Sequence, residues 1–254
     1  MLGIGLGFNP TKECGIFSST RALQLDGNSD YVNLPSAFNS LISRNQMTIS
    51  FWVNMVENDG STSQIIFETR TDSDNLFKVW FHKYYTEWRV ALETDGTTRN
   101  AVYDIPGSSN NDGSGYGDGW VHFAGNYVIS GGSYSVRIYR NGSLIQNTAG
   151  ESGQSDWEGS IAQTRIGANQ DGSNAFVDGN IDQLAVWNVA LPDTAITAIY
   201  NGGVMRDLTT HHPNYTQTVN LIGYYQFEGN VNDSSKNGNH GTLVGTAGFS
   251  NNQP

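Results

Sequence analysis

Ile181-Asp-Gln-Leu-Ala-Val-Trp-Asn-Val-Ala-Leu-Pro192 is the stretch of this chain that is most informative about its fold. Its first half alternates apolar with polar side chains, which predicts a strand that runs into a turn. Pro192 then opens a short helix with one apolar stripe, and Gly202-Gly203 ends it. The stripe consists of Ala195, Ile196, Ile199 and Tyr200. A strand, a short amphipathic helix and a glycine stop, late in a sequence of β character, form a narrow pattern.

Composition limits the classes of protein to which the chain can belong. A length of 254 residues allows one β domain of about 200 residues or a little more, or two small domains. Thirty glycines and only 15% charged residues predict many turns between short strands. A formal net charge of -11 without a Lys/Arg cluster argues against a nucleic-acid partner. The single Cys14 excludes an internal disulfide, and no apolar run reaches the ~18 residues of a membrane span.

Strand patterns fill most of the chain between residues 22 and 188. In residues 47–54, Ile49, Phe51 and Val53 share one face. Residues 134–147 predict a hairpin around Asn141-Gly142, a strong short-turn signal. About a dozen such strands with one late helix predict an all-β, two-sheet jelly-roll sandwich.

Five segments carry a family resemblance. They are ALQLDGNSDYVNL (22–34), MTISFWVN (47–54), WVHFAGNY (120–127), VRIYRNGSLI (136–145) and TRIGANQDGSNAFVDGNIDQLAVWN (164–188). In this order and spacing they resemble the LamG-like (concanavalin A-like lectin/glucanase) jelly-roll family. The resemblance covers residues 22 to 203 and implies the two-sheet fold that the strand patterns predict.

The two ends of the chain resemble phage-encoded members of that family. MLGIGLGF (1–8) is similar to a glycine-rich arm of virion-associated proteins of marine phages. LIGYYQFEGNVNDSSKNGNHGTLVG (221–245) resembles a segment that often precedes a LamG-like domain and that also ends such phage proteins. We therefore expect a complete chain with an N-terminal arm (1–20), a jelly roll (21–203) and a C-terminal extension (204–254). The extension is expected to pack on the same or a neighbouring jelly roll, and both ends to serve assembly.

Catalytic patterns are missing from the sequence. Glycoside hydrolases related to this family place paired carboxylates on alternate residues of one strand, so that both point into the cleft. The nearest acidic run, from Glu68 to Asp74, falls at the end of a predicted strand and is expected to be a turn. The histidines and Cys14 show no spacing typical of a nucleophilic or zinc site. We therefore expect that the protein is not an enzyme.

Calcium is the cofactor that the sequence suggests, since carboxylate and carbonyl oxygens are its ligands. The resemblance implies a structural calcium held by Asp182 and by oxygens around Asp26-Gly27, with Asp30 in the same turn. The alternative is that Asp26 caps this turn and that Asp182 binds backbone amides. The loop with Asn169 and Asp171 is a second candidate for calcium and ligand, or a plain Asn/Asp/Gly hairpin loop.

Aromatic residues in or near loops are candidates for a sugar-binding surface, because sugars stack on exposed rings. Tyr84, Tyr85 and Trp157 are the candidates, with Asn169 and Asp171 as polar partners.

The first functional hypothesis is a non-catalytic structural or adhesion protein of a phage virion. It would be a surface decoration, an appendage or a fibre-associated protein that contacts carbohydrate, another virion protein or further copies of itself. The alternative is a bacterial extracellular or cell-surface module for carbohydrate binding or adhesion. A glycoside hydrolase with an unfamiliar site is a third, weaker hypothesis. None of the three requires a nucleic acid or insertion into a membrane.

Overall fold

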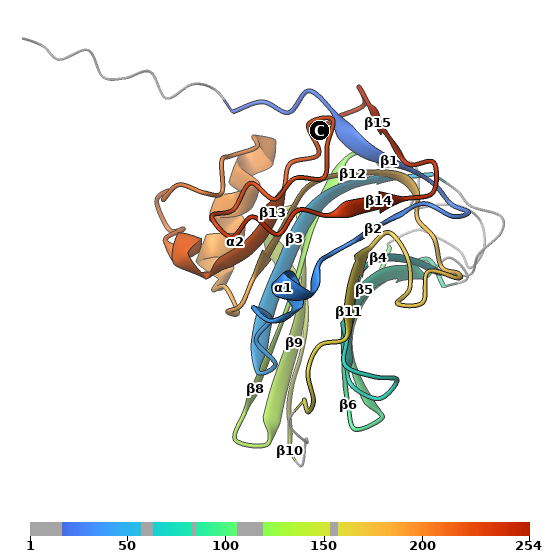
Figure 1. The fold of residues 1–254 in the computed structure, drawn as a ribbon. Coiled ribbons are helices and arrows are strands. Elements are labelled where there is room, and N and C mark those ends of the chain that lie inside the picture. Colours follow the sequence, from blue (N-terminus) through green and yellow to red (C-terminus); the bar gives the residue numbers. More distant parts are fainter. Residues whose placement is uncertain (1–16, 57–62, 83–84, 106–118, 153–156) are drawn as a thin grey trace, which may run out of the picture.

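The computed structural model describes residues 17–56, 63–82, 85–105, 119–152 and 157–254, which form two antiparallel sheets packed face to face (Figure 1). Sheet A contains, in spatial order, β10 (Ser143–Ser152), β9 (Ser133–Arg140), β8 (Val121–Ser130), β3 (Gln46–Met55), β12 (Asp178–Trp187), β1 (Ala22–Asp26) and β15 (Gly248–Ser250), and β13 (Leu221–Tyr225) also pairs with β12. Sheet B contains β14 (Thr242–Val244), β2 (Tyr31–Asn33), β11 (Gln163–Ile166), β4 (Ser63–Arg70), β5 (Leu76–His82), β6 (Glu87–Thr94) and β7 (Thr97–Asp104). The predicted all-β jelly-roll sandwich is confirmed.

The main core lies between the two sheets. Ile49, Phe51 and Val53 of β3 are at most 2% exposed, as their alternation predicts. The rings of Trp88 and Phe123 stack at 4.2 Å between their centroids and so tie β6 to β8. The sheets approach closely at Gly125, where a Cβ atom would lie 2.8 Å from Val90, so only glycine fits.

A second core lies on the outer side of sheet A. The late helix α2 (Asp193–Tyr200) packs there, with Ala195, Ile196 and Ile199 buried. The segment that follows α2 covers the rest, and the Trp187 Nε1 donates to the hydroxyl of Tyr215 at 3.1 Å. The side of α2 that packs on sheet A is therefore the one that carries the predicted apolar stripe. Shorter helical turns occur at α1 (Ser36–Asn39), η1 (Asn201–Gly203) and η2 (Gln217–Asn220).

The C-terminal segment belongs to both sheets. On one edge of β12, β1 pairs with residues 178–181 and β13 pairs with residues 184–187. β14 extends sheet B beside β2, and β15 extends sheet A beside β1. Residues 204–254 thus pack on the same jelly roll and add strands to both of its sheets. The N-terminal arm is outside the described residues up to position 16.

This segment ends beside the start of the described chain. Ser250 of β15 is the ladder partner of Ala22 in β1. The Glu228 carboxylate accepts hydrogen bonds from the Ser19 hydroxyl at 2.7 Å and from the Thr20 amide at 2.9 Å. The C-terminal segment is thus joined to the start of the described chain by a strand pairing and by side-chain hydrogen bonds. Among the described residues, no helix has the length and apolar character that a bilayer crossing requires.

Candidate functional site

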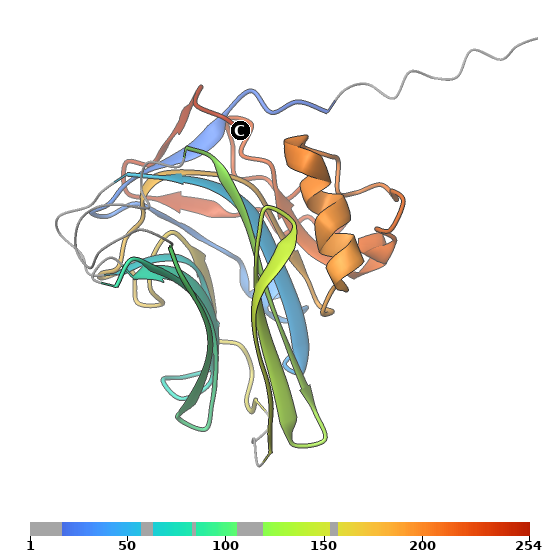
Figure 2. The same ribbon diagram turned by 180° about the vertical axis from the view of Figure 1, so that it is seen from behind.

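Sheet B is curved, and its hollow side faces away from sheet A (Figure 2). Alternation along each strand decides which side chains lie on that side. In β5, Phe77, Val79 and Phe81 enter the core, which leaves Lys78 and Trp80 on the opposite side. We call this side the outer face of sheet B.

Aromatic rings and basic groups alternate across this outer face. The Lys78 ammonium lies 4.6 Å from the centroid of the Trp80 ring. The Arg89 guanidinium carbon lies 5.9 Å from the Trp80 ring and 5.5 Å from the Tyr85 ring. Trp80 is only 7% exposed, whereas Tyr85 is 45% exposed. The four side chains form a cation–aromatic row over β5, β6 and the turn that joins them.

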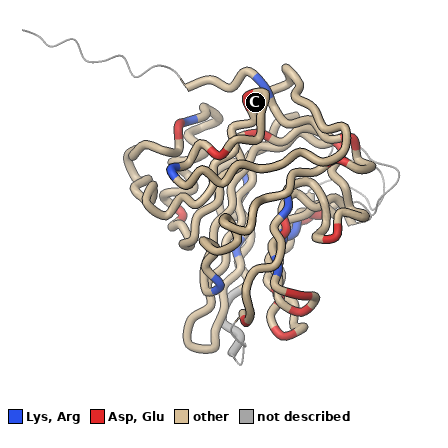
Figure 3. The backbone as a smooth tube through the Cα atoms, in the orientation of Figure 1, with Lys and Arg blue, Asp and Glu red and all other residues tan. Residues whose placement is uncertain are grey.

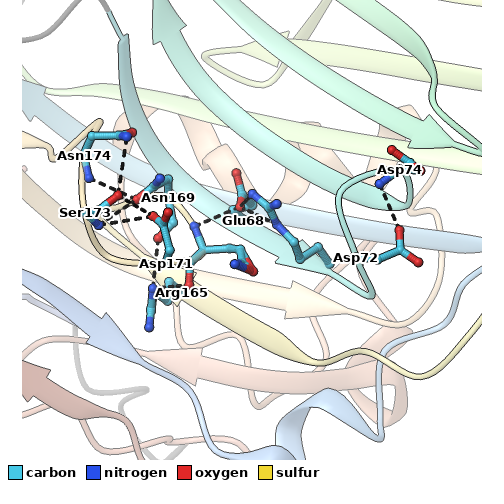
Figure 4. Close-up of polar contacts among 10 residues, drawn as sticks. Glu68, Asp72, Asp74, Arg165, Asn169, Asp171, Ser173 and Asn174 are labelled. Atoms are coloured by element: carbon cyan, nitrogen blue, oxygen red, sulfur yellow. Dashed lines mark hydrogen bonds and ion pairs between the residues drawn. The ribbon is translucent and has the colours of Figure 1, made fainter.

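A network of hydrogen bonds continues the polar surface toward β11 (Figure 4). Glu68 is 2% exposed, and its Oε1 pairs with Arg70 Nη2 at 2.5 Å and accepts the Gln170 amide at 2.9 Å. Arg165 Nε donates to Asn33 Oδ1 at 2.7 Å, and its Nη1 donates to the carbonyls of Asn169 and Gln170. These contacts fasten the loop that follows β11 to the sheet.

The acidic run after Glu68 forms a turn, as expected (Figure 4). Asp72 Oδ1 accepts the Asp74 amide at 2.9 Å and the Asn75 side-chain amide at 3.1 Å. These hydrogen bonds, led by that from the Asp74 amide, lower the pKa of Asp72. Asp72 and Asp74 therefore lie beyond the end of β4 and share no strand with Glu68.

One pair of acidic residues faces across the β6–β7 ladder, where Glu87 is the partner of Asp104. Glu87 is bound to Arg89, with Arg89 Nε at 2.6 Å from Glu87 Oε2. The Glu87 carboxylate is thus engaged by a guanidinium, an arrangement that holds Arg89 in the cation–aromatic row.

The predicted sugar-binding residues have different positions in the structure. Tyr84 is outside the described residues, and Tyr85 is exposed beside Arg89. Trp157 is 2% exposed, and its Nε1 donates to Thr71 Oγ1 at 2.8 Å, so this prediction is corrected: the ring is part of the core.

Asn169 and Asp171 stabilise their own loop. Asn169 Oδ1 accepts the Ser173 and Asn174 amides at 3.1 and 3.2 Å (Figure 4). Asp171 Oδ1 accepts the Ser173 hydroxyl at 2.7 Å, and this bond is the main cause of the lowered pKa of Asp171. Since Arg165 already serves two carbonyls of this loop, a second cation would compete with its guanidinium.

The predicted calcium ligands do not converge. Asp26 is the ladder partner of Asp178, and Asp182 lies beyond the opposite end of the β1–β12 pairing, past the Leu23–Ile181 pair. Burial would raise the pKa of Asp26, but amide hydrogen bonds from Asn28 and Ser29 outweigh it and lower the pKa. The Asp26 carboxylate therefore has hydrogen-bond partners in its own turn, while burial and the charge of Asp26 raise the pKa of Asp178.

Gly27 and Asp30 have structural partners in the same turn. Gly27 donates its amide to the Val177 carbonyl at 2.9 Å. Asp30 is 2% exposed, and its Oδ1 accepts the Thr246 amide at 2.6 Å, which fastens the C-terminal segment. A Cβ atom on Gly245 would lie 2.3 Å from that oxygen.

Asp182 has a different environment. It is fully buried, its Oδ1 accepts the Gln183 amide at 2.7 Å, and its Oδ2 has no hydrogen-bond partner. Burial raises its pKa to about 7, and the charge of Glu228 adds to this effect. The Ser19 hydroxyl lies close enough to Asp182 to lower that pKa, and it also lies within hydrogen-bond distance of Glu228 Oε1 and the Arg21 carbonyl. A buried, unpaired carboxylate oxygen beside a second carboxylate and a hydroxyl fits a hard cation.

Among the residues that the structure describes, no three His, Cys, Asp or Glu side chains are grouped so that they could share a metal ion. A cation at Asp182 would therefore depend on hydroxyl and carbonyl oxygens as well as on carboxylates.

Sequence reasoning missed Lys78, Trp80 and Arg89. The signal was present, since Lys78 and Trp80 alternate with the core residues of β5, and Glu87 and Arg89 alternate with those of β6. Alternation assigns these residues to one face of their strands, but it does not show that the two faces meet in one surface.

Comparisons with known proteins place the fold. Residues 26–197 match the family model described as the concanavalin A-like lectin/glucanases superfamily. The comparison with curated proteins gives no match. A proposed carbohydrate-binding protein from Bacteroides ovatus superposes with a TM-score of 0.61 at 14% identity, over 92% of this chain and 60% of that one. The chain thus spans less than two thirds of that protein.

Two further solved structures are similar. Full-length tailspike protein 2 of the Escherichia coli O157:H7 bacteriophage CAB120 has a TM-score of 0.52 at 12% identity, over 85% of this chain and 31% of the tailspike. The CBM40 of the Ruminococcus gnavus IT-sialidase, bound to alpha2,3 sialyllactose, has a TM-score of 0.50 at 14% identity, over 72% of this chain and 100% of the module. At these identities the likeness shows the fold alone.

Proposed function

This chain belongs to the concanavalin A-like lectin/glucanases superfamily, and we propose that it is a non-catalytic carbohydrate-binding protein of a phage virion. The observation that carries the carbohydrate-binding part is the cation–aromatic row on the outer face of sheet B. Exposed aromatic edges with converging donors are typical of sugar sites. The carbohydrate-binding descriptions of the Bacteroides and CBM40 structures support this part.

The non-catalytic part rests on the carboxylates of sheet B. On the described part of that sheet, Glu68 Oε1 accepts from Arg70 and the Gln170 amide, Glu87 is bound to Arg89, and Glu93 accepts the Thr98 hydroxyl. Asp104 is exposed at the end of β7. A glycosidase needs one carboxyl group that gives a proton and a second that acts as base or nucleophile. Carboxylates held by guanidinium groups are poorly suited to the proton-donating role.

The virion part rests on the resemblance of the chain ends and is supported by the likeness to a phage tailspike. Mass spectrometry of purified particles tests it, and we expect the protein to copurify with them through a density gradient. Recovery from particle-free culture fluid or cell envelopes alone would favour the bacterial adhesive module instead.

Glycan binding without cleavage is the first testable consequence. On a glycan array we expect specific retention, and Tyr85→Ala should weaken it by roughly tenfold, since aromatic contacts contribute about 1 kcal/mol or more. Val219→Ala is the matched control, because Val219 is 70% exposed but lies in η2, on the outer side of sheet A. Steady release of reducing ends from a bound glycan, abolished by Glu87→Gln, would make the protein a hydrolase.

We also propose that Asp182 holds a structural calcium with oxygens of Ser19 and Glu228. The ion would neutralise a carboxylate that is fully buried and has one oxygen without a partner. It would also join β12 to the residues before β1 and to the C-terminal segment. This position differs from the predicted one, because the Asp26–Asp30 turn lies at the other end of the ladder.

The pH dependence of stability tests this calcium site. Without a cation, the folded-state pKa of Asp182, about 7, lies above its ordinary 3.8, so the folded state holds the proton more tightly. Asp182 therefore destabilises the fold increasingly as pH rises from about 4 to about 7. In EDTA, the wild type should lose roughly 2–3 kcal/mol more unfolding free energy between about pH 5 and pH 8 than Asp182→Asn does.

In EDTA at the higher pH, Asp182→Asn should be the more stable of the two proteins. Calcium should make the wild type the more stable one. Millimolar calcium should raise the Tm of the wild type at pH 8 by several degrees and leave Asp182→Asn unchanged. Burial lowers the pKa of His122 to about 3, an effect of opposite sign that both proteins share and that the comparison cancels. An equal Tm with calcium and with EDTA would eliminate the ion, and equal pH profiles would eliminate the role of Asp182.

A further inference from the structure

We propose that the outer face of sheet B selects an anionic glycan, one that carries carboxylate or sulfate groups along its chain. The inference rests on the proposed carbohydrate-binding function and names the class of sugar. Its basis is the excess of basic groups on the part of this face formed by β11, β4 and β5, and the way in which the rings are used.

Three neighbouring strands place a carboxylate between two basic groups. Glu68 of β4 is the ladder partner of Arg165 in β11 on one side and of Lys78 in β5 on the other. The Glu68 Oε1 accepts from Arg70 and from the Gln170 amide. Because Arg70 already pairs with this carboxylate, Glu68 does not neutralise the charges of Arg165 and Lys78.

Neither of these two basic groups has an acidic partner among the described residues. Arg165 donates to the Asn33 side chain and to two loop carbonyls, all of them neutral acceptors. The Lys78 ammonium contacts the Trp80 ring. With strands ~4.8 Å apart, Arg165 and Lys78 stand two strands, or roughly 10 Å, from each other. That separation suits successive charges on an oligosaccharide.

Trp80 and Tyr31 on this face support cations, whereas the ring of Tyr85 is 45% exposed. Trp80 is 7% exposed, with Lys78 and Arg89 on it, and the Arg165 guanidinium carbon lies 4.8 Å from the centroid of the Tyr31 ring. A neutral sugar stacks on a free aromatic face, and these faces are largely occupied. A cation held over a ring is partly desolvated and still directs its charge outward, which favours an anionic ligand.

On β11, β4 and β5 this face carries Arg165, Arg70 and Lys78 against Glu68, whereas its part on β6 and β7 carries Glu87, Glu93 and Asp104 against Arg89. The basic part contrasts with the molecule as a whole, whose formal net charge is -11. Figure 3 shows Lys and Arg as well as acidic residues on the strands of sheet B, and further acidic residues in the turns at its end. At physiological salt the Debye length is about 8 Å, so a ligand at the face responds to the nearby cations more than to distant carboxylates.

The test measures binding of the full chain to three oligosaccharides of equal length. Oligogalacturonate carries carboxylates, a carrageenan oligosaccharide carries sulfates, and a laminarin oligosaccharide is neutral. Calorimetric titration at about 0.05 M and about 0.5 M NaCl separates screened from unscreened contacts. We expect at least tenfold tighter binding of one anionic oligosaccharide than of the neutral one, and a clear loss of affinity at the higher salt.

Three variants locate the charge. Lys78→Gln should weaken binding of the anionic oligosaccharide about tenfold, since it removes a charge-assisted contact. Lys78→Arg keeps the charge and should restore binding. Lys236→Gln makes the same change at an exposed lysine outside the sheets and should have no effect.

Each remaining outcome contradicts the inference, and one of them also contradicts the proposed function. Equal binding of neutral and anionic oligosaccharides overturns the inference and leaves the proposed function standing. No binding of any of the three, together with an empty glycan array, overturns both. Equal losses for Lys78→Gln and Lys236→Gln place the charge effect away from this face and overturn the inference.

Discussion

A chain that ends at Gly203 is expected not to fold, although it keeps every strand that alternation alone identifies. The missing segment carries β13, β14 and β15 and buries seven large, mainly apolar side chains: Leu208, Tyr215, Leu221, Ile222, Tyr224, Tyr225 and Phe227. Loss of one large core side chain typically costs about 2–5 kcal/mol. A domain has only about 5–15 kcal/mol of stability, so the sum exceeds what it can lose. Far-UV circular dichroism and urea unfolding of the truncated chain measure the result.

A rearranged chain provides the control. Residues 204–254, joined by a short Gly/Ser linker to the start of residues 17–203, keep every strand and change only the connection. We expect this chain to fold, because β15 already pairs with β1 and Ser250 lies opposite Ala22. The new ends fall at Gly203 and Val204, and Val204 is 58% exposed. A cooperative unfolding transition in the truncated chain would instead show that the segment is an appendage.

The sandwich could be predicted because each strand and tight turn can be recognised from a short run of consecutive residues. The alternation in residues 47–54 and the Asn141-Gly142 turn depend on neighbours in the sequence, and the structure contains both as expected. The place of the C-terminal segment depends on distant partners. Asp30 Oδ1 accepts the Thr246 amide across 216 positions of sequence, and periodicity carries no record of such pairings.

The candidate site was predictable only in part for the same reason. Loop composition suggested that Trp157 is exposed, but a hydrogen bond to Thr71, 86 positions away, holds it in the core. Asp182 was identified from its strand, but its neighbours Ser19 and Glu228 come from the two ends of the chain. Lys78 and Arg89 meet at Trp80 because β5 pairs with β6 in one particular register. Side chains that act together on a sheet are brought together by register, which a single sequence does not state.

The second large effect is expected from Asp233, a carboxylate inside the C-terminal segment. It is 6% exposed, and its Oδ1 accepts the amides of Tyr224 and Ser235 at 2.9 and 2.8 Å. Its Oδ2 accepts the Ser235 hydroxyl and the Asn239 amide, both at 2.8 Å. Asp233→Ala leaves buried amides without an acceptor, at about 1–3 kcal/mol each, so we expect a loss of roughly 3–5 kcal/mol.

The readout of this variant decides whether the segment and the jelly roll are one cooperative unit. All six tryptophans precede residue 188, so their fluorescence reports mainly on the sheets; Trp120 and Trp187 also donate hydrogen bonds to Asn252 and Tyr215 of the segment. If Asp233→Ala lowers the urea midpoint of tryptophan fluorescence, the segment stabilises the sheets with which it pairs. Asp171→Ala is the matched control, because this exposed aspartate also bonds an amide and a hydroxyl but only within its own loop. It should cost less than about 1 kcal/mol. A midpoint that stays constant for Asp233→Ala would mean that the segment can detach while the sheets remain folded, in contradiction to the pairing of β13 with β12.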